Sequence, residues 1–382
     1  MALRCGLAIL FVLTTACGGG NATSDSAAET NGLRPNGDPV AQSEGAPTRS
    51  SEPTAYQHLA GTTDEEGRIP LDQALSLFAL QYGELPGAAV PPGDPGPAMS
   101  GDIAIDAVFD NWDELSPQQR DAVLTALDLP ADFDPGAPNA PGPIEEPVPT
   151  TRGRSATSRL AADLAPYRSA VDQALAHQER RFGPLGASVV VVDGGRTYGV
   201  ESGRAAADTL VLNPATCRIR VFLDVLPPPD GPNFAPAHEV AHCFQQLWTP
   251  QHWSRAQSWV IEGGANWVAA QTVAELGGSD TRLLSRFLLE YVQSPRTTLF
   301  RRTYSGVGFF ATVAERSGPM WDRMRSAVEA TSPRAAYEAV TGALADDPAL
   351  ADLWATSQVG RPELGARWLL AAPGVPSLTD PA

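Results

Sequence analysis

Basic side chains are scarce in this chain, and long apolar runs are nearly absent. The 382 residues include 27 Lys and Arg against 44 Asp and Glu, a formal net charge of −17. Because contacts to nucleic-acid phosphates need Lys and Arg, we expect no nucleic-acid partner, and the acidic balance favours a solvated extracellular surface. Beyond the N-terminal segment, no stretch is long and apolar enough to be transmembrane. The 43% apolar content suffices for one sizeable core and a small additional module.

The N-terminal segment, residues 1–17, has the layout of an export signal. A short positive stretch with Arg4 precedes an apolar run over 7–13, which is too short to span a bilayer. Cys17 follows a small residue and precedes a Gly-rich tail, which resembles a bacterial lipoprotein signal, although Thr14 stands where Leu is usual. The resemblance implies a lipidated Cys17 and a membrane-anchored chain in the bacterial cell envelope. An ordinary secretion signal is the alternative, and either one takes the protein out of the cytoplasm.

Cysteine is also rare, with four in the chain. Cys5 and Cys17 lie in the export signal, which leaves Cys217 and Cys243 as a pair. Outside the cytoplasm an even pair is typical of a disulfide, and two buried thiols are the alternative. Such a bridge would tie a predicted strand to the helix that carries His242.

Composition divides the rest of the chain into four parts. Residues 18–55 hold hardly any large apolar side chain and indicate a disordered tether. Residues 56–130 contain apolar side chains at helix spacing, with a helix start at Ser116, and predict a small α-helical module. A spacer is the favoured role for this module over a pro-segment or an inhibitory lid. A Pro-rich linker over 131–155 then leads to the second domain, residues 156–382.

Periodicity predicts an α+β second domain. Its first element is a helix over 160–182, and a hairpin turn at 193–195 joins the first two strands. The predicted strands cover 188–192, 197–201, 209–212 and 218–224. After residue 262 the pattern predicts helices over 281–293, 306–317, 321–330, 333–344 and 350–359.

The most informative stretch begins at His238-Glu239-Val240-Ala241-His242, which has the H-E-x-x-H spacing. This spacing puts both histidines on one face of an α-helix, one turn apart, where two imidazoles can bind one Zn²⁺. The glutamate between them can act as general base on the water that the metal activates. Fewer than roughly 0.01 chance matches are expected in a chain with 5 His. A zinc helix that has lost catalysis is the stronger alternative.

A catalytic zinc needs a third protein ligand. Glu262 stands in an apolar helical run twenty residues after His242, where a carboxylate needs a reason to be present. A helix-surface carboxylate is the alternative for Glu262. His252 and Glu275 are the other candidates, but His252 lies beside a tryptophan in a loop, where a surface or packing role is favoured.

These residues together resemble the gluzincin clan of zinc metallopeptidases, the thermolysin-like group, over roughly residues 185–330. The resemblance implies a zincin-like catalytic domain, built from a small sheet, the H-E-x-x-H helix and C-terminal helices. It also implies one Zn²⁺ per chain, held by His238, His242 and Glu262, with Glu239 as the catalytic base in the hydrolysis of peptide or protein substrates. In this clan an edge strand runs along the cleft, so that peptides can bind by strand addition.

The resemblance extends to two further residues. Asn266 stands where thermolysin-like enzymes have an Asp that orients a zinc histidine, and Asn can accept a hydrogen bond but adds no charge. Tyr304 is similar to the tyrosine that stabilises the oxyanion in clan members, and an ordinary half-buried tyrosine is its alternative. For the whole protein the alternative is a non-catalytic zinc-containing surface lipoprotein that binds a partner or a wall polymer.

Overall fold

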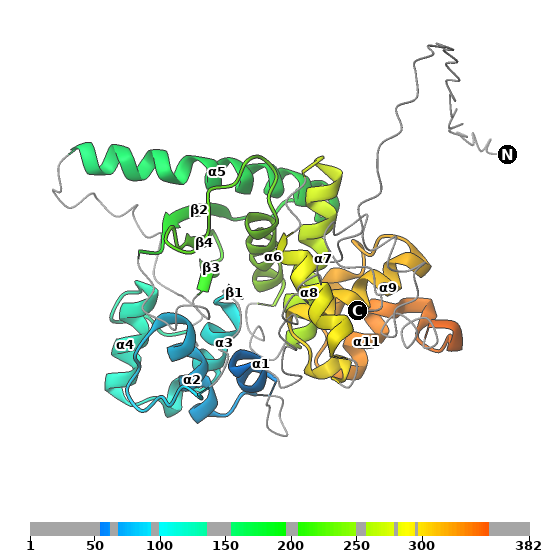
Figure 1. The fold of residues 1–382 in the computed structure, drawn as a ribbon, viewed down its shortest axis with the longest axis horizontal. Coiled ribbons are helices and arrows are strands. Elements are labelled where there is room, and N and C mark those ends of the chain that lie inside the picture. Colours follow the sequence, from blue (N-terminus) through cyan, green and yellow to red (C-terminus); the bar gives the residue numbers. More distant parts are fainter. Residues whose placement is uncertain are drawn as a thin grey trace, which may run out of the picture. The chain divides into compact units, whose positions relative to one another are not determined.

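A small mixed β-sheet organises the computed structural model of the chain (Figure 1). The strand order is β1-β3-β4-β2, in which β4 runs antiparallel to β3 and parallel to β2, and β1 runs parallel to β3. The strands are β1 (Met99–Ser100), β2 (Ser188–Asp193), β3 (Ala205–Asn213) and β4 (Thr216–Val221). The structure describes residues 54–61, 68–92, 99–135, 154–195, 205–249, 257–278, 282–294 and 297–350.

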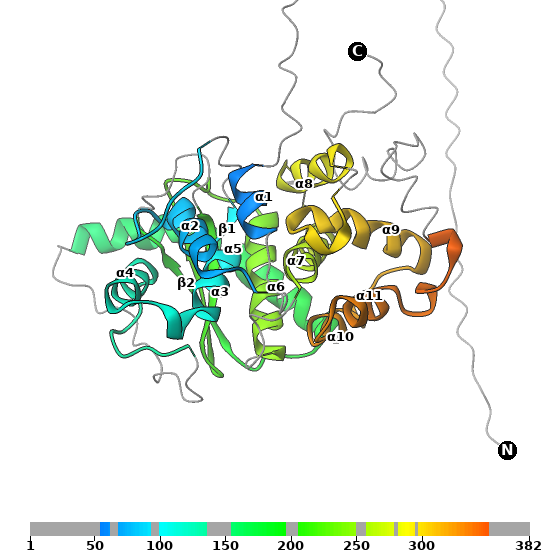
Figure 2. The ribbon, with the colours of Figure 1, turned by 90° about the horizontal axis from the view of Figure 1, so that it is seen from below.

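Helices make up most of the remaining described chain (Figures 1 and 2). Those before the linker are α1 (Ala55–Ala60), α2 (Leu71–Tyr82), α3 (Asp102–Asp110), η1 (Trp112–Glu114) and α4 (Pro117–Leu127). Those after it are α5 (Arg154–Phe182), α6 (Phe234–Trp248), α7 (Ser258–Glu275), α8 (Arg282–Gln293), η3 (Leu299–Arg301), η4 (Tyr304–Gly306), α9 (Val307–Ser317), α10 (Met324–Val328), α11 (Pro333–Thr341) and η5 (Gly342–Leu344). Among the described helices, none has both the length and the apolar character needed to cross a membrane.

The side chains of β4 alternate between two chemically different faces of the sheet. Cys217 and Ile219 point to one face, where a disulfide joins Cys217 to Cys243 of α6. This is the pairing expected for the two cysteines outside the export signal. Arg218 and Arg220 point to the other face and are nevertheless buried, at 5% and 2% exposure. The elements that cover this second face must therefore supply hydrogen-bond acceptors for the two arginines.

The C-terminal end of α4 supplies these acceptors. Arg218 donates hydrogen bonds of 2.7 and 3.0 Å to two main-chain carbonyls at this end, which have no partner within the helix. Arg220 donates to the carbonyl of Ala126 at 2.7 Å and makes two hydrogen bonds, of 2.9 and 2.7 Å, to the carboxylate of Asp208 on β3. These bonds tie the N-terminal helices to the sheet, and Ser50–Ala382 forms one compact unit.

The α+β class and the helical character of residues 56–130 agree with the structure. Ser116 caps α4, since its side chain accepts a hydrogen bond from the Gln119 main-chain N–H. The module is not a detached spacer, however, because its helices pack on the sheet and β1 joins it. The strand 197–201, expected to form a hairpin with β2, lies outside the described residues, so the hairpin stays a prediction. On its described side β2 pairs with β4 in parallel, and Gly194 N–H continues this pairing by donating to Val221 O at 2.9 Å.

Several bounds differ from the predicted ones. The helix α5 begins at Arg154, six residues before its predicted start and inside the predicted linker, and β3 begins at Ala205 instead of 209. The helix predicted over 321–330 is the shorter α10, and the one predicted over 333–344 divides into α11 and the 3-10 turn η5. Several predictions lie outside the described residues: the export signal with Cys17, nearly all of the tether over 18–55, most of the linker over 131–155, the strand over 197–201, His252, and nearly all of the helix over 350–359.

The Cys217–Cys243 disulfide generates a stability prediction. Its two cysteines are 26 positions apart in sequence, and closing a loop of this length in the unfolded chain contributes about 3.5 kcal/mol. We therefore expect the double variant Cys217→Ala/Cys243→Ala to lower the free energy of unfolding by about 3.5 kcal/mol in chemical denaturation. A reductant should destabilise the wild type and leave the double variant unchanged. Equal stability of the oxidised wild type and the variant would contradict the prediction.

Candidate metal centre

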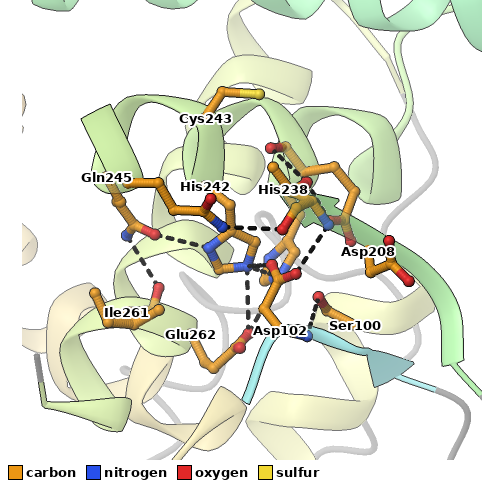
Figure 3. Close-up of polar contacts among 12 residues, drawn as sticks. Ser100, Asp102, Asp208, His238, His242, Cys243, Gln245, Ile261 and Glu262 are labelled. Atoms are coloured by element: carbon orange, nitrogen blue, oxygen red, sulfur yellow. Dashed lines mark hydrogen bonds and ion pairs between the residues drawn. The ribbon is translucent and has the colours of Figure 1, made fainter. Parts of the chain in front are cut away.

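Helix α6 carries two histidines into the protein interior. Asn233 caps its first turn, where its side chain accepts a hydrogen bond from Ala235 N at 3.2 Å. His238 and His242 follow one turn apart on one face, at 4% and 0% exposure. Their Nε2 atoms are 2.8 Å apart, so both rings turn a nitrogen toward the same small volume (Figure 3).

Glu262 of α7 brings a carboxylate to the same volume. Its Oε2 lies 3.2 Å from His238 Nε2 and 3.6 Å from His242 Nε2. Ligands of a tetrahedral zinc with bonds of about 2.0–2.1 Å lie about 3.3 Å apart, so the three observed spacings bracket the expected value. The Glu262 side chain is fully buried, and neither oxygen has a hydrogen-bond partner among the described residues. A carboxylate in this state is costly, and a cation held by His238, His242 and Glu262 would remove that cost.

Two glycines directly after Glu262 allow a further segment to approach α7. A Cβ atom at Gly263 would lie 2.8 Å from the main chain of Gly306, and one at Gly264 would lie 2.7 Å from the side chain of Met324. A glycine in a helix interior destabilises the helix by roughly 1 kcal/mol relative to alanine. The presence of two glycines here therefore indicates that the close packing excludes larger residues. The segment that Gly263 admits is η4, which begins with Tyr304.

Tyr304 lies beside the metal cluster and is fully buried, at 1% exposure. Its ring is nearly parallel to the His238 ring, with centroids 5.9 Å apart. Asn266 joins the two residues, because its Nδ2 donates to Tyr304 O at 2.9 Å and its side chain interacts with His238. The Tyr304 hydroxyl donates to the main-chain carbonyl of Ser100 at 2.9 Å.

Gln245 orients His242 and was not among the residues predicted from the sequence. His242 Nδ1 lies 2.7 Å from Gln245 Oε1, and Gln245 Nε2 donates to Ile261 O at 3.0 Å (Figure 3). Because the amide oxygen accepts, Nδ1 is the protonated nitrogen and Nε2 is left for the cluster. Its position one turn after His242 is a local signal that could have identified it.

Glu239 sits next to the cluster on the side of β3. The Thr209 hydroxyl lies 2.7 Å from Glu239 Oε2, within donating distance, and both residues are buried. Burial raises the pKa of Glu239 well above its ordinary value, and the nearby Asp102 carboxylate raises it further. Glu239 is thus placed and tuned as a group that can exchange a proton near the cluster.

Asp102 was not predicted, and it comes from the N-terminal module. It is the first residue of α3, and its Oδ2 lies 3.1 Å from His242 Nε2, the nitrogen that faces the cluster (Figure 3). Its Oδ1 accepts a hydrogen bond from Thr209 N at 2.8 Å. Burial raises the pKa of Asp102 to about 7 although His242 opposes the rise. Asp102, Glu239 and His242 form a second group with the spacing of metal ligands. No local pattern in the sequence distinguishes Asp102 as part of this centre.

Glu275, the alternative third ligand, belongs elsewhere. It lies at the end of α7, where its Oε2 is 3.0 Å from His177 Nε2 and also contacts Arg181. The third residue that joins the two histidines is Glu262.

Comparison of the chain with protein-family models, with curated proteins and with solved structures finds no match. The gluzincin resemblance therefore rests on the residues of the centre.

The contact between Gln245 and His242 generates the second prediction. We expect Gln245→Leu to weaken metal binding 10–100-fold, roughly the loss seen when partners that orient a metal-binding histidine are removed. Competition with a chromogenic chelator measures the affinity, and circular dichroism checks the fold. Gln173→Leu on α5, where the side chain bonds only an exposed serine, is the matched control. Equal affinity of both variants would show that Gln245 does not orient a metal ligand.

Proposed function

We propose that the chain is an exported zinc metallopeptidase that hydrolyses peptide bonds. The observation that carries the proposal is the convergence of His238, His242 and Glu262, with Glu239 beside them. Two imidazoles and one carboxylate form a ligand set that suits zinc, whereas calcium and magnesium prefer oxygen ligands alone. Three ligands of this kind, with an open fourth position, are typical of catalytic zinc.

Bound zinc would lower the pKa of a water molecule and polarise the scissile carbonyl. Glu239 takes a proton from the attacking water and then delivers it to the leaving amine. The raised pKa of Glu239 suits this double role, and the Thr209 hydroxyl holds its carboxylate in place. Tyr304, beside His238, would donate a hydrogen bond to the oxyanion once its hydroxyl is free of the Ser100 carbonyl. Asn266 fixes the main chain of Tyr304 and lies close to His238, whose ring it would orient.

Export is proposed from the N-terminal sequence and from the disulfide. A disulfide between Cys217 and Cys243 is stable in an oxidising compartment, which agrees with the export signal. A lipid on Cys17 and the tether over 18–55 would hold the domain near the bacterial membrane, where it would act on peptides or proteins.

A second candidate is a non-catalytic zinc-containing surface lipoprotein that binds a partner or a wall polymer. The observation in its favour is Asp102, whose carboxylate lies 3.1 Å from His242 Nε2. A zinc site with four protein ligands is typical of structural zinc. The two candidates differ in whether Glu239 is needed.

Glu239→Gln separates the two candidates. We expect this variant to keep one zinc per chain and to lose at least about 100-fold in peptide cleavage, the smaller end of what general acid–base catalysis contributes. Cleavage of a mixed-sequence peptide pool is measured by mass spectrometry, with and without a chelator. Because the N-terminal module covers the centre, each protein is assayed intact and after a cut at a site-specific protease sequence introduced into the linker.

Glu338→Gln is the control, since Glu338 lies on the exposed surface of α11 and pairs with Arg334. Peptide cleavage that the chelator abolishes, and that Glu338→Gln retains, supports the peptidase. Cleavage that persists in Glu239→Gln, or zinc-bound wild type that cleaves nothing in either form, favours the binding protein.

A further inference from the structure

Three consecutive residues of the N-terminal module, Ser100, Gly101 and Asp102, occupy three positions that a substrate would need. The first position is the edge of the sheet, where β1 pairs with β3 in parallel. Ser100 lies opposite Ala207, and Gly101 N donates to Ala207 O at 2.9 Å. Without β1, the strand β3 would be the free edge next to α6. A peptide that binds by strand addition would need this edge.

The second occupied position lies between the metal ligands and the general base. An attacking water must contact the metal and lie within hydrogen-bond reach of Glu239. Asp102 fills this space, because its Oδ2 lies 3.1 Å from His242 Nε2 and its carboxylate belongs to one group with Glu239 and His242. Its other oxygen accepts a hydrogen bond from Thr209 N of β3. Without Asp102, a substrate carbonyl could accept this hydrogen bond.

The third occupied position is the hydroxyl of Tyr304. It donates to the Ser100 carbonyl at 2.9 Å, and this carbonyl stands where the proposed oxyanion would receive the same hydrogen bond. Ser100 and Asp102 are both buried, at 6% and 1% exposure. The sheet edge, the water position and the oxyanion donor are thus blocked by one short segment.

Part of the surface beneath the module is polar. Arg218 and Arg220 donate hydrogen bonds to carbonyls of α4, and Asp208 accepts one from the Tyr82 hydroxyl at 2.8 Å. If the module left, Arg220 and Asp208 would remain paired, and Arg218 would exchange two carbonyls for water. Apolar side chains of the module belong to the same core as those of the second domain, so release of the module would also expose apolar surface.

We infer that the N-terminal module, residues 56–130, is an internal inhibitor, and that Asp102, which lies against His242 and Glu239, closes the open side of the metal centre and keeps the intact chain latent. The inference rests on the proposed function for the metal and the substrate cleft. Release of the module removes Asp102 from the metal, frees the edge of β3 and frees the Tyr304 hydroxyl. The alternative for Asp102, a permanent structural ligand, predicts that the centre never opens.

Cobalt spectroscopy of the full chain tests whether Asp102 acts at the metal centre. With Co²⁺ in place of zinc, the visible absorption reports the ligand set. We expect Asp102→Asn to retain one Co²⁺ and to shift the visible bands, whereas Asp121→Asn, at an exposed position of α4 in the same module, leaves them unchanged. Identical spectra of Asp102→Asn and the wild type, or loss of the Co²⁺ from Asp102→Asn, would overturn the inference.

Titration with acetohydroxamate, a small metal chelator, tests latency without any substrate. We expect the wild type to bind it at least tenfold more tightly after the linker is cut and the module removed by gel filtration. A module that stays bound after the cut, or a cut protein with unchanged affinity, would count against an inhibitor. Because both readouts are independent of peptide cleavage, they can succeed while the peptidase assay fails. Cleavage by the intact wild type, equal to that of the cut form, would instead support the proposed function and overturn latency.

Discussion

A fully buried carboxylate that faces two buried imidazoles is the interaction on which the rest of the structure depends. Among the described residues, the only polar partners of the Glu262 carboxylate are the Nε2 atoms of His238 and His242, at 3.2 and 3.6 Å. Such a group is tolerated when a cation or a compensating network is present. Gln245 hydrogen-bonds the His242 ring, and the disulfide joins α6, which carries both histidines, to the sheet.

The same cluster joins the two halves of the chain. Asp102 reaches His242 from α3, and Ser100 accepts the hydrogen bond of Tyr304 from β1. Two buried arginines on β4 continue the contact along the sheet. The N-terminal module thus covers a polar face of the sheet and the cluster of His238, His242 and Glu262 together, so one segment completes the fold and, under the proposed function, restrains the chemistry.

Local patterns in the sequence predicted much of this arrangement. The i, i+4 histidines of α6, the helix start at Ser116 and the apolar strand β2 follow from short-range periodicity and capping, which are local properties. Glu262 was predicted as the third metal ligand because a carboxylate in an apolar run is costly to bury unless it binds a cation.

The contacts between residues far apart in sequence correspond to no local pattern. Asp102 lies far from His238 in sequence, in an apolar segment typical of an ordinary helix, so only the folded chain brings it to His242. The parallel pairing of β2 with β4 joins strands that have β3 between them in sequence, so no short-range pattern indicates it. The sequence favoured a spacer for residues 56–130, because the packing of these residues on Arg218 and Arg220 is a property of the assembled fold.

X-ray absorption at the zinc edge of the intact, purified chain tests the central claim most directly. The account predicts one zinc per chain with nitrogen and oxygen neighbours at about 2.0–2.1 Å, including the scattering pattern of two imidazoles. A sulfur neighbour at about 2.3 Å, or a chain that retains no zinc, would contradict it.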